Sequence, residues 1–125
     1  MTALDRADEL KARTKQFAIR IVQVFRSLPR ETDAYGVGKQ LLRSGTSVAA
    51  NYRAVCRARS QQEFVAKMGI VVEEADETGF WLEMLIETGI ISRERAANLL
   101  GEATSYSQCS QRRSVRPSGN QSILR

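Results

Sequence analysis

The chain has 125 residues, a net charge of +5, two prolines and no histidine. This length suits one domain with a real core and is short for two. The lack of histidine excludes the usual general base, the Ser–His and Cys–His nucleophile pairs and most mixed zinc sites. Long periodic stretches without proline favour helices over a sheet of short strands. We therefore expect one all-α domain that is not an enzyme and uses no cofactor and no metal.

The cysteines and the N-terminal residues bear on the location of the protein. Cys56 and Cys109 lie far apart in the sequence, and this spacing indicates a reduced compartment rather than a disulfide framework. The first ten residues are charged, and no apolar run approaches the roughly 20 residues that span a bilayer. We expect a cytoplasmic protein that does not contact a membrane.

Two helices are predicted in the first half of the chain. Apolar residues recur at alternating steps of four and three over residues 8–28, and Pro29 ends this helix. The second helix starts near Thr32 or Asp33, because either side chain can accept hydrogen bonds from the first free backbone N–H groups. It runs to about Arg57. Small residues in its middle allow another helix to approach closely. The side of the second helix that can be buried consists of Leu41, Gly45, Val48, Tyr52 and Val55.

A third helix is predicted from the capping box Ser60-Gln61-Gln62-Glu63 to Gly89, which can take a left-handed conformation. Its apolar seam consists of Phe64, Met68, Val71, Ala75, Thr78, Leu82 and Leu85.

A fourth helix starts at the cap Ser92 and runs to about Gln111, with a thinner seam of Ala96, Leu99, Ala103 and Tyr106. Four helices with short connections pack as an antiparallel, up-down-up-down bundle with crossings of about 20°. We expect residues 1–111 to form this single bundle domain and residues 112–125 to form a basic, polar and flexible tail.

Charge is sorted by segment. Residues 1–59 hold 12 Lys and Arg against 5 Asp and Glu, residues 60–91 hold 1 against 7, and residues 92–125 hold 6 against 2. Such sorting supports contacts between basic and acidic helices or subunits and leaves a positive field for polyanions. The alternative is an ordinary solvated surface.

The second helix carries a basic stripe almost opposite the side that can be buried. We predict that Lys39, Arg43 and Arg57 contact the phosphates of a nucleic acid, because this stripe faces away from the core. No aromatic residue interleaves the stripe, so stacking on unpaired bases has little support. The alternative is a solvated face. The stripe consists of Lys39, Arg43, Thr46, Ala50, Arg53 and Arg57.

The third helix has more apolar surface than its seam requires. Ile70, Phe80, Trp81 and Met84 project away from the seam and predict a subunit interface anchored by Trp81. The alternative is that this helix is wedged between two neighbours of the same bundle and needs a wide apolar face.

Three segments of the sequence read LLRSGTSVAANYR at 41–53, RARS at 57–60 and EEADETGFWLE at 73–83. Together they resemble the bacterial four helix bundle protein family. That family includes the proteins encoded by intervening sequences within 23S rRNA genes, and it is similar to the accessory variability determinant of diversity-generating retroelements. The resemblance implies a left-handed antiparallel bundle, assembly into a homopentamer and no catalytic activity. In the retroelement branch it further implies binding of a reverse transcriptase and of nucleic acid.

The family signature also includes polar, charged and aromatic residues on the second and third helices. Arg43, Asn51 and Arg53 match it on the second helix, and Glu74, Glu77 and Trp81 match it on the third. We interpret Arg53 and Glu77 as an ion pair that braces the two helices, since an arginine fork fits a carboxylate.

These observations favour a non-enzymatic homo-oligomer that binds the phosphate backbone of a nucleic acid, most readily RNA. The alternative is a protein–protein accessory subunit, on whose acidic third helix a reverse transcriptase or another basic partner docks.

Overall fold

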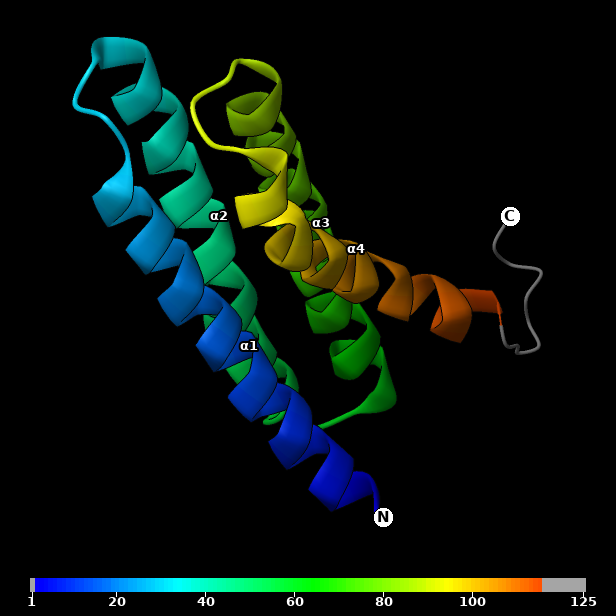
Figure 1. Cartoon of the computed structure of the whole chain (residues 1–125). Coiled ribbons are helices and arrows are strands. Elements are labelled where there is room, and N and C mark those ends of the chain that lie inside the picture. Colours follow the sequence, from blue (N-terminus) through cyan, green and yellow to red (C-terminus); the bar gives the residue numbers. More distant parts are fainter. Residues whose placement is uncertain (1, 116–125) are drawn as a thin grey trace.

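In the part of the chain that the structure describes, there are four antiparallel helices and no strand. The computed structural model describes residues 2–115 and contains α1 (Ala3–Ser27), α2 (Thr32–Val55), α3 (Gln61–Glu87) and α4 (Arg93–Val115). Successive helices run in opposite directions and are joined by short connections (Figure 1). The prediction of an all-α up-down-up-down bundle is confirmed.

The helix ends follow from local hydrogen bonds. α1 starts earlier than predicted because Thr2 and Asp5 form a capping box, with the Thr2 hydroxyl accepting the Asp5 N–H at 3.1 Å. The Ser60 hydroxyl accepts the Glu63 N–H at 3.0 Å and starts α3 as predicted. The Glu63 carboxylate, however, accepts the N–H of Arg59 rather than that of Ser60. α3 ends as predicted before Gly89, which has a φ of +78°.

Two predicted boundaries are wrong by a few residues. α2 ends at Val55, so Arg57 lies in the following turn. The N-cap of α2 is Glu31, whose side chain makes no capping hydrogen bond. α4 continues past Gln111 to Val115, so the predicted tail starts inside the helix. The rest of that tail, residues 116–125, lies outside the described residues.

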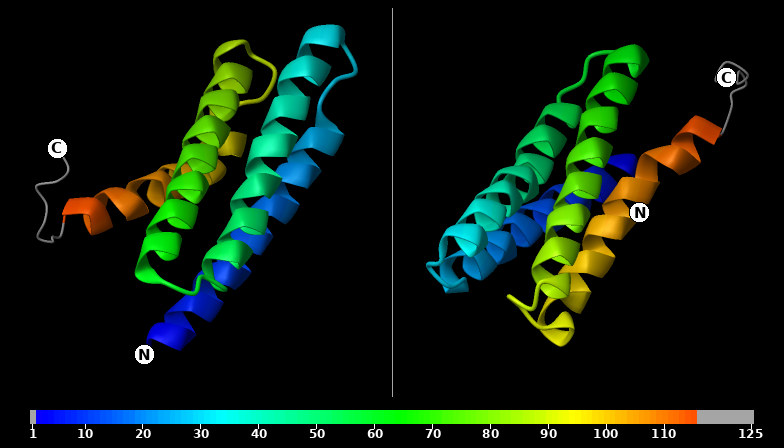
Figure 2. Two further views of the ribbon diagram at one scale, coloured as in Figure 1. Left: turned by 180° about the vertical axis from the view of Figure 1, so that it is seen from behind. Right: turned by 90° about the horizontal axis from the view of Figure 1, so that it is seen from above.

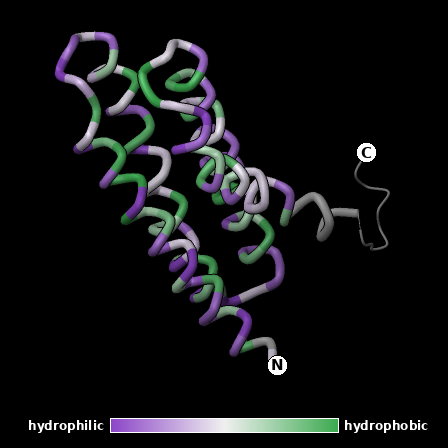
Figure 3. The backbone as a smooth tube through the Cα atoms, in the orientation of Figure 1, coloured by the Kyte–Doolittle hydropathy of each residue, from purple (hydrophilic) through white to green (hydrophobic). Residues whose placement is uncertain are grey.

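The core is formed by the apolar seams that the periodicity predicts. In Figure 3, hydrophobic and hydrophilic residues alternate along the helices at intervals of about one turn. The largest side chains that are fully buried come from all four helices and belong to Phe17, Ile21, Leu41, Val48, Val71, Leu82, Leu85 and Tyr106.

α1 and α2 approach each other closely at two glycines. A Cβ atom at Gly45 would lie 2.8 Å from Ile21 Cγ1, and a Cβ at Gly38 would lie 2.7 Å from Leu28 Cδ1. Both distances are shorter than real Cβ contacts. The two helices can therefore be this close only because glycine has no side chain at these positions. The predicted close approach at the thin middle of α2 is confirmed.

α4 packs against α3 but crosses it obliquely, so its C-terminal end leads away from the other helices (Figures 1 and 2). Long side chains bridge α4 to α1. The aromatic rings of Phe17 and Tyr106 meet edge to face, with centroids 5.3 Å apart. Within residues 2–115 no helix is both long and apolar enough to cross a membrane.

Candidate nucleic-acid interface

Arg43 joins α2 to α3. Its guanidinium pairs with the Glu77 carboxylate through Nη2 and with Glu74 through Nη1, at 3.4 Å. The indole Nε1 of Trp81 donates to the same Glu77 oxygen at 3.1 Å. The hydrogen bonds from Arg43 and Trp81 lower the pKa of Glu77, and the hydrogen bond to Glu77 raises the pKa of Arg43. Glu77 is therefore a carboxylate and Arg43 a cation at neutral pH.

The predicted ion pair between Arg53 and Glu77 is wrong, because Arg43 occupies that position. In an antiparallel hairpin, residues face each other when they are about equally far from the connection. Arg43 and Glu74 lie about equally far from the connection at residues 56–60, whereas Arg53 lies much closer to it. Counting outward from the connection would have identified the correct arginine. Arg43, predicted to contact phosphate, instead has its charge engaged within the bundle.

Lys39 and Arg57, the other two predicted phosphate contacts, lie exposed near opposite ends of α2. The Lys39 ammonium lies 5.4 Å from the centroid of the Tyr35 ring, one helical turn earlier. An aromatic ring therefore lies beside the first residue of the basic stripe, one turn before the stripe begins, and no aromatic residue belongs to the stripe itself. Arg57 follows the end of α2, and its N–H donates to the Ala54 carbonyl at 3.1 Å.

Cations of α1 join this stripe at the end of the bundle that holds the N-terminus. A groove of about 380 Å³ between α1 and α2 is lined by Lys11, Lys15 and Arg53, with the small Ala12 and Ala49 and a single acid, Asp8. Lys11 and Lys15 are one turn apart, so the spacing i, i+4 could have predicted that they share a face. Sequence reasoning missed them because it read α1 only for its apolar seam.

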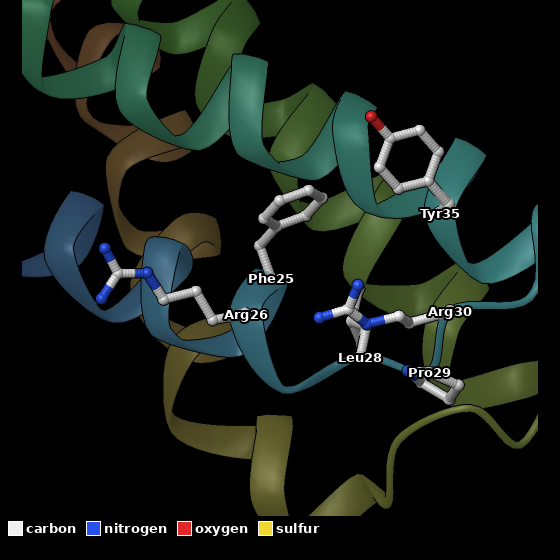
Figure 4. A pocket seen from close by; sticks show the side chains of 6 residues that line it. All are labelled: Phe25, Arg26, Leu28, Pro29, Arg30 and Tyr35. Atoms are coloured by element: carbon white, nitrogen blue, oxygen red, sulfur yellow. The ribbon is translucent and has the colours of Figure 1, made fainter.

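A second basic group lies at the other end of the same two helices. Arg26 and Arg30 line a pocket together with Phe25 and Tyr35 (Figure 4). Lys39 lies over the ring of Tyr35. We call the exposed cations that α1, α2 and their connection bring together the α1–α2 basic face. It consists of Lys11, Lys15, Arg26, Arg30, Lys39 and Arg53.

α3 presents the opposite charge. Exposed acids recur along it at steps of three and four, interrupted by Phe80, whose exposed fraction is 50%. We call this surface the α3 acidic stripe. It consists of Glu73, Asp76, Phe80, Glu83 and Glu87.

The four residues predicted at a subunit interface differ in exposure. Ile70 and Phe80 are exposed, whereas Trp81 and Met84 are partly buried. The Phe80 and Trp81 rings meet edge to face with centroids 4.8 Å apart, and Trp81 packs against the core. Part of the wide apolar face is therefore used inside the monomer, and the subunit interface stays a prediction.

Glu102 on α4 is a charged group that the sequence did not single out. It lies 3.7 Å from Arg13 and 3.6 Å from Arg20, both on α1, and it accepts the hydroxyl of Tyr106. Burial and the neighbouring Glu102 raise the pKa of Tyr106, which keeps its hydroxyl protonated as the donor. This network ties α4 to α1, so Arg13 and Arg20 are engaged like Arg43.

The helices and their surfaces define an all-α four-helix bundle with one basic and one acidic side. The chain belongs to the 23S rRNA-intervening sequence protein family, whose model matches residues 8–111. This confirms the family resemblance, while the similarity to the retroelement accessory protein stays a prediction.

A solved structure with the same fold is that of a protein with unknown function from the S23 ribosomal protein family of Bacteroides thetaiotaomicron. The two chains are 38% identical and superpose with a TM-score of 0.73, over 80% of this chain and 93% of that one. Among curated proteins, none matches the chain significantly.

Proposed function

We propose that this protein is a non-enzymatic homo-oligomer, expected to be a homopentamer, that binds RNA through the phosphate backbone. The observation that carries the proposal is the α1–α2 basic face, where Lys11, Lys15 and Arg53 line one groove. Lysine and arginine side chains bind phosphates whatever the base sequence. Because the family is named for a 23S rRNA intervening sequence, we propose RNA as the polyanion that is bound.

The pairing of charges inside the bundle decides which cations are available. Arg43 pairs with Glu74 and Glu77, and Arg13 and Arg20 pair with Glu102. A phosphate would have to compete with these carboxylates. We therefore assign the phosphate contacts to the α1–α2 basic face, which includes Lys39, and to Arg57. Of the three residues predicted from the sequence to contact phosphate, only Arg43 is left out.

Binding of two unrelated single-stranded RNAs at low salt tests the proposal. The double variant Lys15→Ala/Arg53→Ala should weaken both RNAs by a similar factor, because phosphate contacts carry no sequence information. The matched control Lys67→Ala/Arg93→Ala removes the same charge from α3 and α4 and should change affinity much less. Equal losses in the two double variants would show that net charge acts alone, without the basic face.

A second candidate function is that of a protein–protein accessory subunit, for example of a reverse transcriptase. The α3 acidic stripe supports it, since Phe80 is exposed in the middle of four carboxylates. A basic protein surface with an apolar pocket would complement this stripe. If the wild type binds no RNA at low salt, this function becomes the first choice. Phe80→Ala should then weaken binding of the partner.

A further inference from the structure

The connection between α1 and α2 forms a pocket of about 510 Å³, which is within the usual range for small-molecule sites. Its lining contains two arginines and two aromatic rings but no acid, and consists of Phe25, Arg26, Leu28, Pro29, Arg30 and Tyr35. In Figure 4 the Arg30 guanidinium is directed to the side where Phe25 lies, and the Arg26 guanidinium points away.

The local packing holds one aromatic ring at the surface. Phe25 and Leu28 lie against Gly38, where a side chain would displace them. Phe25 in turn supports the Tyr35 ring, with centroids 6.2 Å apart and planes inclined by 44°. Tyr35 itself is 54% exposed. Packing in the core therefore does not explain why an aromatic residue stands at position 35, because most of the Tyr35 side chain faces solvent.

One cation, Lys39, lies over this ring, and a second, Arg30, lines the same pocket. An exposed aromatic ring beside cations binds unpaired nucleotides, because the base stacks on the ring and the phosphate meets the charges. Paired bases are stacked inside a duplex and cannot reach such a ring.

We propose that this pocket binds an unpaired nucleotide, with the base stacked on Tyr35 and the phosphate held by Arg30 and Lys39. The inference rests on the proposed RNA binding and adds that single strands are preferred over duplexes. The same chemistry is offered by a free nucleoside monophosphate and by a nucleotide within a strand. The position of the pocket on the α1–α2 basic face favours the strand.

The test uses a short single-stranded RNA that carries 2-aminopurine, the same strand in a duplex, and AMP as a competitor. The wild type should bind the single strand more tightly than the duplex and quench the 2-aminopurine fluorescence. Tyr35→Ala and Tyr35→Leu should lower the single-strand affinity about five- to 100-fold and abolish the quenching. Tyr35→Phe retains the ring and should bind like the wild type.

The salt dependence separates stacking from phosphate contact. Tyr35 carries no charge, so Tyr35→Ala should lower the affinity without changing the slope of log affinity against log salt. RNA binding that is indifferent to Tyr35→Ala and equal for strand and duplex would overturn this inference and leave the proposed function intact. Binding of AMP that Tyr35→Ala abolishes, with RNA affinity unaffected by the same substitution, would overturn the strand as the ligand. No RNA binding at low salt would overturn both proposals.

Discussion

Arg43 and Glu77 form the ion pair that joins α2 to α3, and Trp81 donates its indole N–H to the same carboxylate oxygen. The Glu77 carboxylate is thus held by the Arg43 guanidinium of α2 and by the Trp81 indole of α3. The side chains of Arg43 and Glu77 are 49% and 37% exposed, so water screens their attraction. The pair therefore aligns two helices more than it stabilises the fold.

Arg43→Ala and Glu77→Gln are expected to couple weakly in a double-mutant cycle. The coupling free energy of unfolding should be about 0.5–1 kcal/mol, as for half-exposed pairs with good geometry. Urea unfolding of the wild type, both single variants and the double variant measures it. Arg53→Ala is the matched control and should not couple with Glu77→Gln. Coupling to Arg53 instead of Arg43 would contradict the observed pair.

The contribution of Glu77 to stability should depend on pH. Its pKa in the folded protein is below the ordinary value of 4.5, so the unfolded state binds more protons in the window between the two values. The stabilisation is thus present above pH 4.5 and is lost as the pH falls through the folded-state pKa. Unfolding measured from neutral to acid pH should show that wild type and Glu77→Gln converge at low pH. If the stability difference between wild type and Glu77→Gln increased as the pH fell, the lowered pKa of Glu77 would be contradicted.

Gly45→Ala should destabilise the protein, because the new Cβ would lie 2.8 Å from the side chain of Ile21. We expect a loss of about 1–3 kcal/mol from overpacking. Gly101→Ala in α4 is the control, since a Cβ there meets nothing within 4 Å, and it should stabilise by roughly 0.5–1 kcal/mol. Thermal unfolding of both variants checks this. Equal effects would show that α1 and α2 are not as close as described.

Assembly can be tested at the apolar part of α3. Light scattering coupled to gel filtration should give the mass of an oligomer, expected to be a homopentamer. Phe80→Ala and Trp81→Ala should both lower that mass. Phe80 is the sharper test, since Trp81 also binds Glu77 and packs against the core. Ile19→Ala on α1, 38% exposed, should leave the mass unchanged. A wild-type monomer at micromolar concentration would refute the subunit interface.

The periodicity of the sequence predicted the helices and their buried seams, because burial of one side of a helix leaves a repeat of 3.6 residues. It did not predict which arginine meets Glu77, since a repeat identifies a face but not the register between two helices. The groove at Lys11 and Lys15 was missed for a related reason. Its charge arises only where α1 is placed beside Arg53 of α2.

The pocket at Tyr35 and the network at Glu102 depend on contacts between distant residues. Tyr35 lies one turn before Lys39, the first residue of the predicted stripe, so that stripe does not include the ring. Glu102 has partners on α1, far away in the sequence, and no local pattern relates it to Arg13 or Arg20.

The central claim is that the α1–α2 basic face and Arg57 bind RNA phosphates, and a salt titration of RNA binding tests it most directly. Each phosphate that a cation neutralises on a single strand contributes about −0.7 to the slope of log affinity against log salt. Lys39→Ala/Arg57→Ala should weaken every RNA to a similar degree and flatten the slope by about 0.7 for each phosphate that is no longer neutralised. A slope that the double substitution leaves unchanged would contradict the claim and show that these side chains are only solvated.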